Sequence, residues 1–259
     1  MTSSTPTLSA LGLTSYALRQ VPRHFGALAG LLAPAILILI AAAVLVPNLW
    51  PQAVPNSEEP VASGGAAAML LIAIVAANLA LIPALTGWHR LIVLPDPTRA
   101  NGRLYGWSRV EWRYLGKLLA IWLVTVVVNI IGGVVLNILG GSPFATVLLN
   151  FLLLVAAAFV WAHMGLALPA TAIGGNPRFR EVGELVGENL TRIALGLFAV
   201  WFVAGIFITV IILGAFYIGE AIGSSYIIYI AAVCSYFVAI FASAAVLSRA
   251  YTLLTGMDD

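Results

Sequence analysis

Charged side chains are scarce in this sequence, and long stretches contain none. Of the 259 residues, 12 are Lys or Arg and 10 are Asp or Glu, so charged residues make up only 8% of the chain. Soluble domains carry roughly 25%. Together with 62% hydrophobic residues, this shortage excludes an ordinary soluble protein. The stretches that lack Asp, Glu, Lys and Arg are residues 25 to 57, 60 to 88, 118 to 177, 193 to 219 and 221 to 248.

Cysteine and the common catalytic motifs are also missing. Cys234 is the only cysteine, which excludes an intramolecular disulfide and a cysteine cluster that would hold a metal. The sequence contains no HExxH, GxSxG or P-loop motif, so it gives no support to a zinc protease, a serine hydrolase or a P-loop nucleotide-binding protein. We therefore expect no metal, no cofactor and no nucleic-acid partner. Residues 1 to 18 lack the basic start and cleavage site of a signal peptide, so we expect the first apolar stretch to remain as an anchor.

The uncharged stretches predict six membrane-spanning helices. A helix needs about 20 apolar residues to cross the roughly 30 Å hydrocarbon layer, and the stretch from 118 to 177 is long enough to cross twice. Its reversal is predicted at Gly140-Gly141-Ser142-Pro143, a cluster of helix breakers. The predicted fold is an all-α polytopic membrane protein with a single domain, residues 1 to 259. Its six transmembrane helices are placed at residues 25 to 47, 66 to 88, 115 to 138, 144 to 168, 193 to 217 and 225 to 248.

All Arg and Lys residues fall on one side of this arrangement, whereas the opposite loops contain only Glu58, Glu59 and Glu220. Because basic residues favour the cytoplasmic side, both termini and two basic loops are predicted to be cytoplasmic, in a bacterial inner membrane. Trp50, Trp88, Trp107 and Trp112 lie near predicted span ends, where indole rings favour the head-group region. The basic residues are Arg19 and Arg23; then Arg90, Arg99, Arg103, Arg109, Arg113 and Lys117; then Arg178, Arg180 and Arg192; and finally Arg249.

Three of the cytoplasmic segments have the pattern of an amphipathic helix. In residues 107 to 118, Arg109, Arg113 and Lys117 form one stripe, and Tyr114 lies on the apolar side. Residues 178 to 190 separate in the same way, and residues 10 to 21 do so more weakly, with an apolar side made of Ala10, Leu11, Ala17, Leu18 and Val21. Such helices lie in the membrane interface with the apolar face toward acyl chains. Tyr114 and Val182 are expected to turn toward lipid or toward the bundle. We therefore predict cytoplasmic amphipathic interfacial helices.

Each amphipathic segment precedes a pair of spans, so the chain divides into three similar units. The entry Arg23-His24-Phe25-Gly26 is similar to Arg113-Tyr114-Leu115-Gly116. Repeats of this kind are common in membrane proteins. Two interpretations stay open: three pseudo-repeats of an amphipathic helix plus two spans, or a chance likeness between apolar helices that follow basic residues.

Three span exits carry a resemblance to a known family. They are Trp88-His89-Arg90, Leu168-Pro169-Ala170-Thr171-Ala172-Ile173-Gly174 and Arg249-Ala250-Tyr251. With the order of the units, they resemble a family of six-helix bacterial inner-membrane proteins related to the membrane domain of glycerophosphoryl diester phosphodiesterases. The resemblance runs from about Ala10 to Leu254 and implies fold and location only. In those phosphodiesterases the chemistry belongs to a separate soluble domain, so no catalytic residue carries over.

One group of residues has the composition of a catalytic site. His89, Arg90, Asp96 and Glu111 lie near the predicted cytoplasmic surface, and an acid and an imidazole beside arginines suit attack on a phospholipid head group. The spacing does not bring them together. His89 beside Arg90 is more typical of an interface anchor, and Asp96 between two prolines is more typical of a turn. We predict that the chain is not an enzyme.

A transporter is a second class to consider. Prolines in three spans and Gly132-Gly133 in the third could bend or break helices and expose backbone groups. Transporters of ions usually hold an ionisable residue deep in the bilayer, however, and here only His163 comes close. Amides commonly join membrane helices by hydrogen bonds. The intramembrane polar candidates are Asn78, Asn129, Asn137, Asn150 and His163.

The remaining class is a non-catalytic membrane-organising protein or accessory subunit that binds lipids, other membrane proteins or itself. We predict this function, with a transporter or permease of a small or lipid-like substrate as one alternative and a lipid head-group modifying enzyme as another. The same basic residues are needed for orientation, so their presence alone does not separate these classes. The lipid- or partner-binding candidates are Arg90, Arg99, Arg103, Arg109, Arg113 and Lys117.

Two substitution experiments follow from this hypothesis. Replacing His89, Asp96, Glu111 or His163 individually by alanine is expected to leave folding and function mostly intact. Neutralising Arg109, Arg113 and Lys117 together is expected to weaken association with anionic lipid or a partner.

Overall fold

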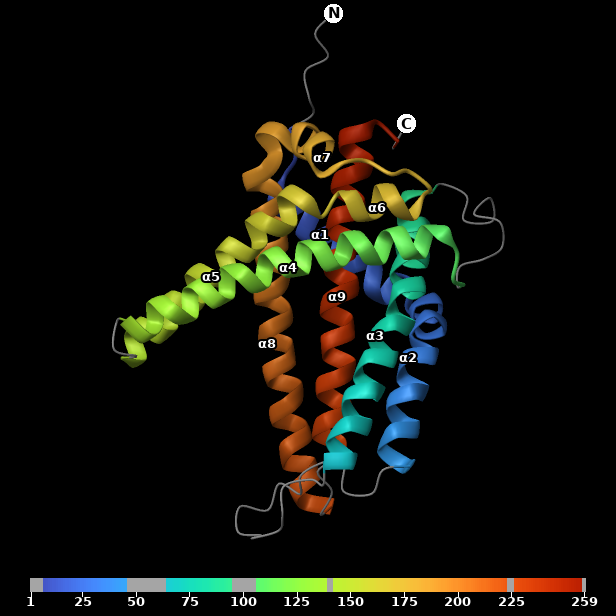
Figure 1. The fold of residues 1–259 in the computed structure, drawn as a ribbon, viewed down its shortest axis with the longest axis vertical. Coiled ribbons are helices and arrows are strands. Elements are labelled where there is room, and N and C mark those ends of the chain that lie inside the picture. Colours follow the sequence, from blue (N-terminus) through green and yellow to red (C-terminus); the bar gives the residue numbers. More distant parts are fainter. Residues whose placement is uncertain (1–6, 46–63, 95–105, 139–141, 223–225, 258–259) are drawn as a thin grey trace, which may run out of the picture.

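The computed structural model describes residues 7–45, 64–94, 106–138, 142–222 and 226–257, and most of these residues are helical (Figure 1). No strand occurs among them, which confirms the all-α prediction for this part of the chain. The elements are α1 (Ala10–Arg23), α2 (Phe25–Leu45), α3 (Gly64–Val93), α4 (Arg109–Ile138), α5 (Pro143–Met164), α6 (Ala167–Ala172), α7 (Phe179–Val186), the 3-10 turn η2 (Gly187–Asn189), α8 (Leu190–Ile222) and α9 (Tyr226–Thr255).

Five helical segments are long and apolar enough to cross a membrane. The number rises to six if α1 and α2, which meet at a 76° bend, form one bent span. Each of the six predicted spans coincides with one long helix, namely α2, α3, α4, α5, α8 or α9. A continuous helix suits these sequences because it satisfies its backbone hydrogen bonds internally, as hydrocarbon requires. The chain is therefore an all-α polytopic protein with five or six helices able to span a membrane.

The core lies between α3, α8 and α9, with α1 packed across α8 and α9 (Figure 1). Trp88 of α3 is fully buried there, and its ring meets the Phe241 ring of α9 edge-on at 5.5 Å between centroids. Its Nε1 donates a hydrogen bond of 2.9 Å to the Phe241 carbonyl oxygen, which satisfies the buried indole. Trp88 therefore fills the space between α3 and α9 in the last turns of α3, and its ring faces protein on all sides.

α1 is fixed to the bundle by a face that overlaps only in part with the predicted apolar side. Ala17 is buried, as predicted, and so is Leu13, whereas Leu11 and Leu18 are exposed. The Ser9 hydroxyl caps the helix by accepting a hydrogen bond from the Gly12 backbone N–H. The buried face follows from the close approach to α8, where the Thr14 hydroxyl donates to the Gly196 carbonyl oxygen at 3.3 Å and Leu13 packs over the same glycine.

The other two amphipathic segments are helical, but they pack against protein. Residues 109 to 118 form the first turns of α4 and not a separate helix, and Tyr114 is buried. α7 is a separate helix, and its Val182 and Val186 are buried in the core. Tyr114 and Val182 thus point into the bundle, which is one of the two environments predicted for them. Their apolar residues have protein partners because α7 packs against α5 and α4 packs against α6.

α4 and α5 form a hairpin that runs obliquely to the other long helices, and its tip projects away from them (Figure 1). α4 ends at Ile138 and α5 begins at Pro143, on either side of the predicted reversal, of which Gly140 and Gly141 lie outside the described residues. The Ser142 hydroxyl caps α5 by accepting from the Ala145 N–H at 3.2 Å. Gly132-Gly133 does not interrupt α4. α5 ends at Met164 and α6 begins at Ala167, and the apolar stretch long enough to cross a membrane, Pro143–Ala172, includes both helices and the predicted boundary at 168.

Every Arg and Lys among the described residues lies at one end of the bundle, which we call the basic end. It comprises α1, α6, α7, the last turns of α3 and α9 and the first turns of α4 and α8, in the upper part of Figure 1. Gly174, with φ of 100°, lets the chain turn sharply after α6 and return toward α7. Arg99 and Arg103 fall outside the described residues.

Candidate functional site

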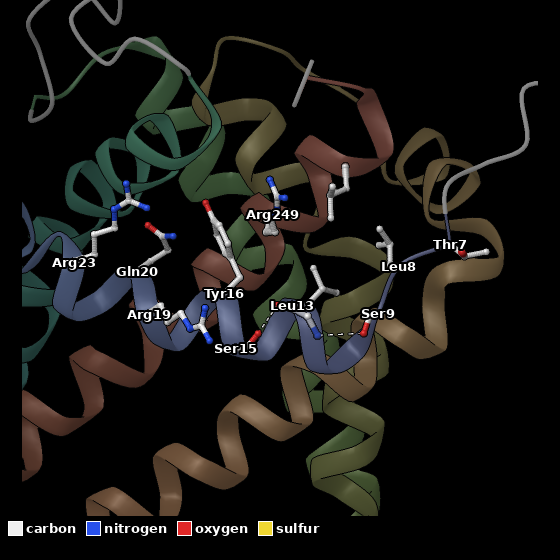
Figure 2. A pocket seen from close by; sticks show the side chains of 12 residues that line it. Thr7, Leu8, Ser9, Leu13, Ser15, Tyr16, Arg19, Gln20, Arg23 and Arg249 are labelled. Atoms are coloured by element: carbon white, nitrogen blue, oxygen red, sulfur yellow. Dashed lines mark hydrogen bonds between the residues drawn. The ribbon is translucent and has the colours of Figure 1, made fainter.

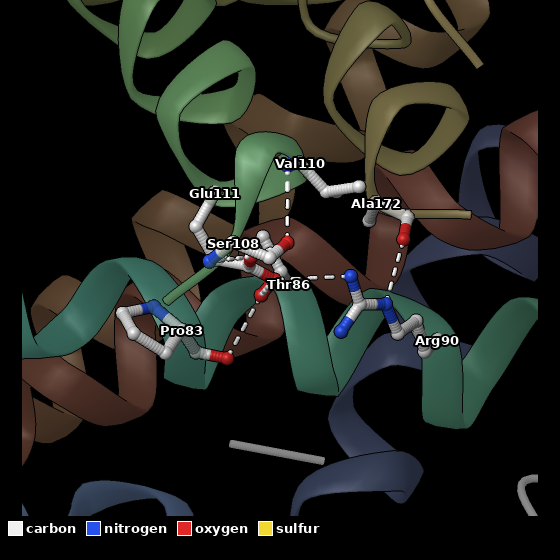
Figure 3. A network of polar contacts seen from close by, with 7 residues as sticks. All are labelled: Pro83, Thr86, Arg90, Ser108, Val110, Glu111 and Ala172. Carbon is white, nitrogen blue, oxygen red and sulfur yellow. Dashed lines mark hydrogen bonds and ion pairs between the residues drawn. The ribbon is translucent and has the colours of Figure 1, made fainter. Parts of the chain in front are cut away.

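A buried ion pair joins α3 to α4 at the basic end (Figure 3). The Arg90 Nη2 donates to Glu111 Oε1 at 3.0 Å, and the side chain of Glu111 is only 2% exposed. The same oxygen accepts from the Thr86 hydroxyl at 3.3 Å. The other oxygen accepts from the Ser108 backbone N–H at 2.7 Å and from the Ser108 hydroxyl. Every oxygen of this buried carboxylate is therefore partnered, as a buried charge requires.

The Arg90 guanidinium also connects this pair to α6. Its Nε donates to the Ala172 carbonyl oxygen at 2.7 Å, at the last residue of α6. α6 is one and a half turns long, so its terminal carbonyls lack helical partners and accept well from a side chain. One arginine thus joins α3, α4 and α6.

His89, the neighbour of Arg90, points to a different helix. Its Nδ1 lies 2.7 Å from the Ser248 hydroxyl of α9, and its Nε2 lies 3.0 Å from the Tyr114 hydroxyl of α4. All three side chains are buried, with exposed fractions of 1% or less. Both ring nitrogens are therefore engaged, and each hydroxyl can donate or accept according to the tautomer.

The structure brings three of the four predicted catalytic residues to neighbouring turns, but only Arg90 and Glu111 contact each other, and His89 has different partners. His89 bonds to Ser248 and Tyr114, whereas Glu111 bonds to Arg90, Thr86 and Ser108. Asp96 lies outside the described residues. The groups are buried and hydrogen-bonded to one another, an arrangement typical of polar contacts that hold helices together. Sequence reasoning missed Thr86, Ser108, Tyr114 and Ser248, because single hydroxyls give no local signal.

The predicted lipid-binding residues divide into internal and surface groups. Arg90 is used in the ion pair, and the Lys117 Nζ donates to the Pro177 carbonyl oxygen at 2.5 Å. Arg109 is exposed and Arg113 is half-buried. Only these two of the four described candidates present their charges mainly to the outside.

The predicted intramembrane amides do not join helices. Asn78, Asn129 and Asn137 each donate to the carbonyl oxygen four residues earlier in their own helix, at 2.8, 2.8 and 3.1 Å. These three side chains and Asn150 are exposed on the surface of the described bundle. His163 is also exposed, and its ring lies against Gly183 of α7, where a Cβ atom would come within 2.5 Å of it.

A second polar site lies on the other side of the basic end, between α1 and the last turns of α9 (Figure 2). It is a half-open pocket of about 660 Å³. The Arg249 guanidinium lies over the Tyr16 ring, with its Cζ 4.9 Å from the ring centroid. The residues that line the pocket are Thr7, Leu8, Ser9, Gly12, Leu13, Ser15, Tyr16, Arg19, Gln20, Arg23, Arg249 and Leu253.

Sequence reasoning assigned Arg19, Arg23 and Arg249 only to membrane orientation. Their convergence depends on α1 folding across α9, and residues more than 200 positions apart give no local pattern for this contact. The described part of the chain contains no group of three His, Cys, Asp or Glu side chains arranged to hold a metal ion.

Comparison with protein-family models, curated proteins and solved structures gave no match to this chain. The resemblance to the membrane domain of glycerophosphoryl diester phosphodiesterases accordingly remains an expectation from the span exits.

Proposed function

We propose that this chain is a non-catalytic integral membrane protein that organises proteins laterally in the membrane, with the α4–α5 hairpin as its docking element. The observation that carries the proposal is the low burial of this hairpin. Within the apolar stretch of α4 only 11% of residues are buried, and within the stretch of α5 and α6 only 6%, against 17% in the stretch that contains α8, 50% in α9 and 56% in α3. A hairpin that leans away from its own bundle presents two helices to other molecules in the bilayer (Figure 1).

The exposed surface of α4 contains a stripe suited to another helix. Thr125, Asn129, Gly133 and Asn137 follow one another at intervals of four residues and therefore share one side of the helix. A Cβ atom at Gly133 would meet nothing within 4 Å, whereas one at Gly132 would meet Leu153 of α5. Gly132 thus allows α4 to pack closely against α5, whereas Gly133 faces away from the hairpin. Small residues allow close approach of membrane helices, and amides join them.

The amides of this stripe have unused hydrogen-bonding capacity. Asn129 and Asn137 each donate one N–H to their own helix, but an asparagine side chain has two N–H donors and an acceptor oxygen. No contact with another described residue is made by the remaining groups. At bilayer depth such groups favour an interhelical partner, worth about 0.6 to 2 kcal/mol per bond.

The partner that fits best is the same stripe of a second copy. Because an asparagine amide both donates and accepts, a stripe of asparagines is complementary to itself. Two identical surfaces facing each other also give the closed twofold arrangement that most homo-oligomers use. Self-association of this kind is how we propose that the chain organises its surroundings.

The basic end supports the location and orientation that accompany this function. All described Arg and Lys residues gather there, and basic residues favour the cytoplasmic side. We propose that the basic end faces the cytoplasm in a bacterial inner membrane, and that α1, α7 and the first turns of α4 lie near the head groups. His89 and the Arg90–Glu111 pair support a non-catalytic role, because their polar atoms are already used in hydrogen bonds that join helices.

Disulfide trapping in membranes tests this proposal. In a Cys234→Ser background, which removes the single native cysteine, we compare Asn129→Cys with Ile131→Cys. Both positions are exposed and lie at similar depth on α4, but they are on opposite sides of the helix. Mild oxidation is expected to give a cross-linked dimer for Asn129→Cys and little for Ile131→Cys. Equal yields at both positions, or no dimer at either, would show that this stripe is not a self-association surface.

A further inference from the structure

The pocket between α1 and α9 has the charge of an anion-binding site. Its twelve lining residues include Arg19, Arg23 and Arg249 and no Asp or Glu. Arg19 and Arg23 are exposed one turn apart on α1 at this pocket, and two like charges so close together favour an anionic ligand. Guanidinium groups also match phosphate in geometry, because they can donate two parallel hydrogen bonds.

A buried amide supplies a second, independent indication of a ligand. Gln20 is only 6% exposed, and it lines the pocket from the same side of α1 as Tyr16 and Arg23 (Figure 2). The described residues offer its side-chain amide no hydrogen-bond partner. A buried polar group without a partner costs about 1 to 3 kcal/mol, so its placement against a cavity is explained if a ligand supplies the missing bonds.

The remaining lining residues fit a ligand that is partly apolar. Leu8, Leu13 and Leu253 line the pocket beside the arginines, and the Tyr16 ring adds a further apolar surface. The volume of about 660 Å³ lies within the roughly 300 to 1,000 Å³ of small-molecule sites, far more than a free phosphate ion fills. α1 leads directly through the 76° bend into the apolar helix α2, so the pocket opens beside a membrane-spanning element.

From these observations we propose that the pocket binds the phosphate group of an anionic phospholipid. Arg19 and Arg23 hold the phosphate oxygens from α1, and Arg249 contributes its positive charge from α9. Gln20 donates its amide N–H to the same head group. The leucines contact the glycerol and the first acyl carbons. Basic pockets between membrane helices are general sites for anionic head groups, and this one is separate from the self-association stripe on α4.

The test uses the full-length protein in a zwitterionic detergent, titrated with dioctanoyl phosphatidic acid while unfolding is followed by tryptophan fluorescence. A ligand that binds only the folded state raises the melting temperature in proportion to its occupancy. The same titration is run with dioctanoyl phosphatidylcholine and with inorganic phosphate. We expect a saturable rise with phosphatidic acid and a much smaller one with the other two probes.

Three double variants test which residues bind the lipid. The double variant Arg19→Gln/Arg23→Gln removes two charges from the pocket, and at about 1 kcal/mol for each charge the apparent Kd should rise roughly 30-fold. Arg178→Gln/Arg180→Gln is the matched control, because it removes two exposed arginines from the same end of the bundle outside the pocket. The control should bind as the unmodified protein does. Arg19→Lys/Arg23→Lys keeps the charge and should recover most of the affinity.

Each contrary result overturns the proposal. Equal stabilisation by inorganic phosphate would identify a free anion as the ligand, and equal stabilisation by phosphatidylcholine would remove the role of net charge. If the control variant loses as much affinity as the pocket variant, the attraction is a property of the whole basic end. The unmodified protein is folded at the start of each melting experiment. If phosphatidic acid gives no saturable rise in its melting temperature, the pocket binds no such lipid.

Discussion

The buried polar residues of the basic end differ in whether the protein itself satisfies them. His89 and Glu111 have partners for every polar side-chain atom, whereas the Gln20 amide has none among the described residues. Because burial of a polar group is costly without a hydrogen bond, the first two are explained by the fold and the third is explained by a ligand. This distinction also changes what alanine should do at His89 and Glu111, where the sequence alone suggested tolerance.

Removal of the Glu111 carboxylate should strongly destabilise the protein. Glu111→Ala removes a buried carboxylate that accepts hydrogen bonds from Arg90 and Ser108, and removing one member of a buried pair costs about 3 to 5 kcal/mol. We expect a large fall in melting temperature in detergent. Glu184→Ala is the control, because it breaks the exposed Arg180–Glu184 pair of α7, worth only about 0 to 1 kcal/mol. Similar melting temperatures for the two variants would contradict a structural role for the Arg90–Glu111 pair.

His89 and His163, two histidines near the basic end, should respond to alanine substitution to different degrees. His89→Ala opens a cavity and deprives the buried Ser248 and Tyr114 hydroxyls of a partner, at about 1 to 3 kcal/mol for each unsatisfied group. His163 is exposed, so His163→Ala should change stability by no more than about 0.5 kcal/mol. Thermal unfolding of both variants gives the comparison. A stable His89→Ala protein would mean that the histidine does not join α9 to α4.

At the scale of helices, the sequence predicted most of what forms. Uncharged stretches determined the six long helices to within a few residues of most ends, and Ser142 with Pro143 marked the start of α5. Helix breaks were harder to predict, because a helix can continue through a pair of glycines when the neighbouring residues pack well. α4 continues through Gly132-Gly133, yet the chain breaks after Met164, where Gly165 approaches Leu247 of α9.

Contacts between helices were beyond local patterns. Periodicity identified an apolar side of α1 that is partly exposed, because the buried side is decided by α8 and α9. The Arg90–Glu111 pair and the meeting of Arg19 and Arg23 with Arg249 both depend on tertiary packing. A single sequence identifies arginines near a membrane but does not separate those that form a pocket from those that only orient the chain.

Adjacent glycines in α4 allow the hairpin to be tested separately from its docking surface. Gly132→Val should weaken α4–α5 packing, because even a Cβ atom there would lie 2.6 Å from two Leu153 methyl carbons, so we expect a lower melting temperature. Gly133→Val faces open space and should leave the melting temperature nearly unchanged. It should nevertheless reduce cross-linking of Asn129→Cys, because the added side chain holds the second helix away. If both variants unfold at the same temperature, the two faces of α4 are assigned wrongly.

The whole molecule has two different surfaces, at the basic end and along the oblique hairpin. The basic end combines positive charge with a pocket, and the hairpin combines low burial with amides. Because these surfaces are made by different helices, lipid binding and self-association can be removed independently. An organising protein gains from this separation, since an anionic lipid bound at α1 and α9 does not compete with a helix docked on α4.

Membrane topology is the prediction that belongs to the entire chain. With six spans, reporter fusions after Gly102 and Pro177 should read cytoplasmic, and fusions near Ser57, Ser142 and Gly223 should read external.

The α1–α2 bend leaves the first span as the one that decides between five and six crossings. If α2 crosses, a fusion at Ser57 lies on the opposite side from a reporter at the N-terminus. If only the other five helices cross, the two reporters agree and the N-terminus lies opposite the C-terminus. Since Arg19 and Arg23 lie in α1 at the basic end beside Arg249 of α9, we expect both termini on one side, and a reversed reading at any one loop would contradict the six-span arrangement.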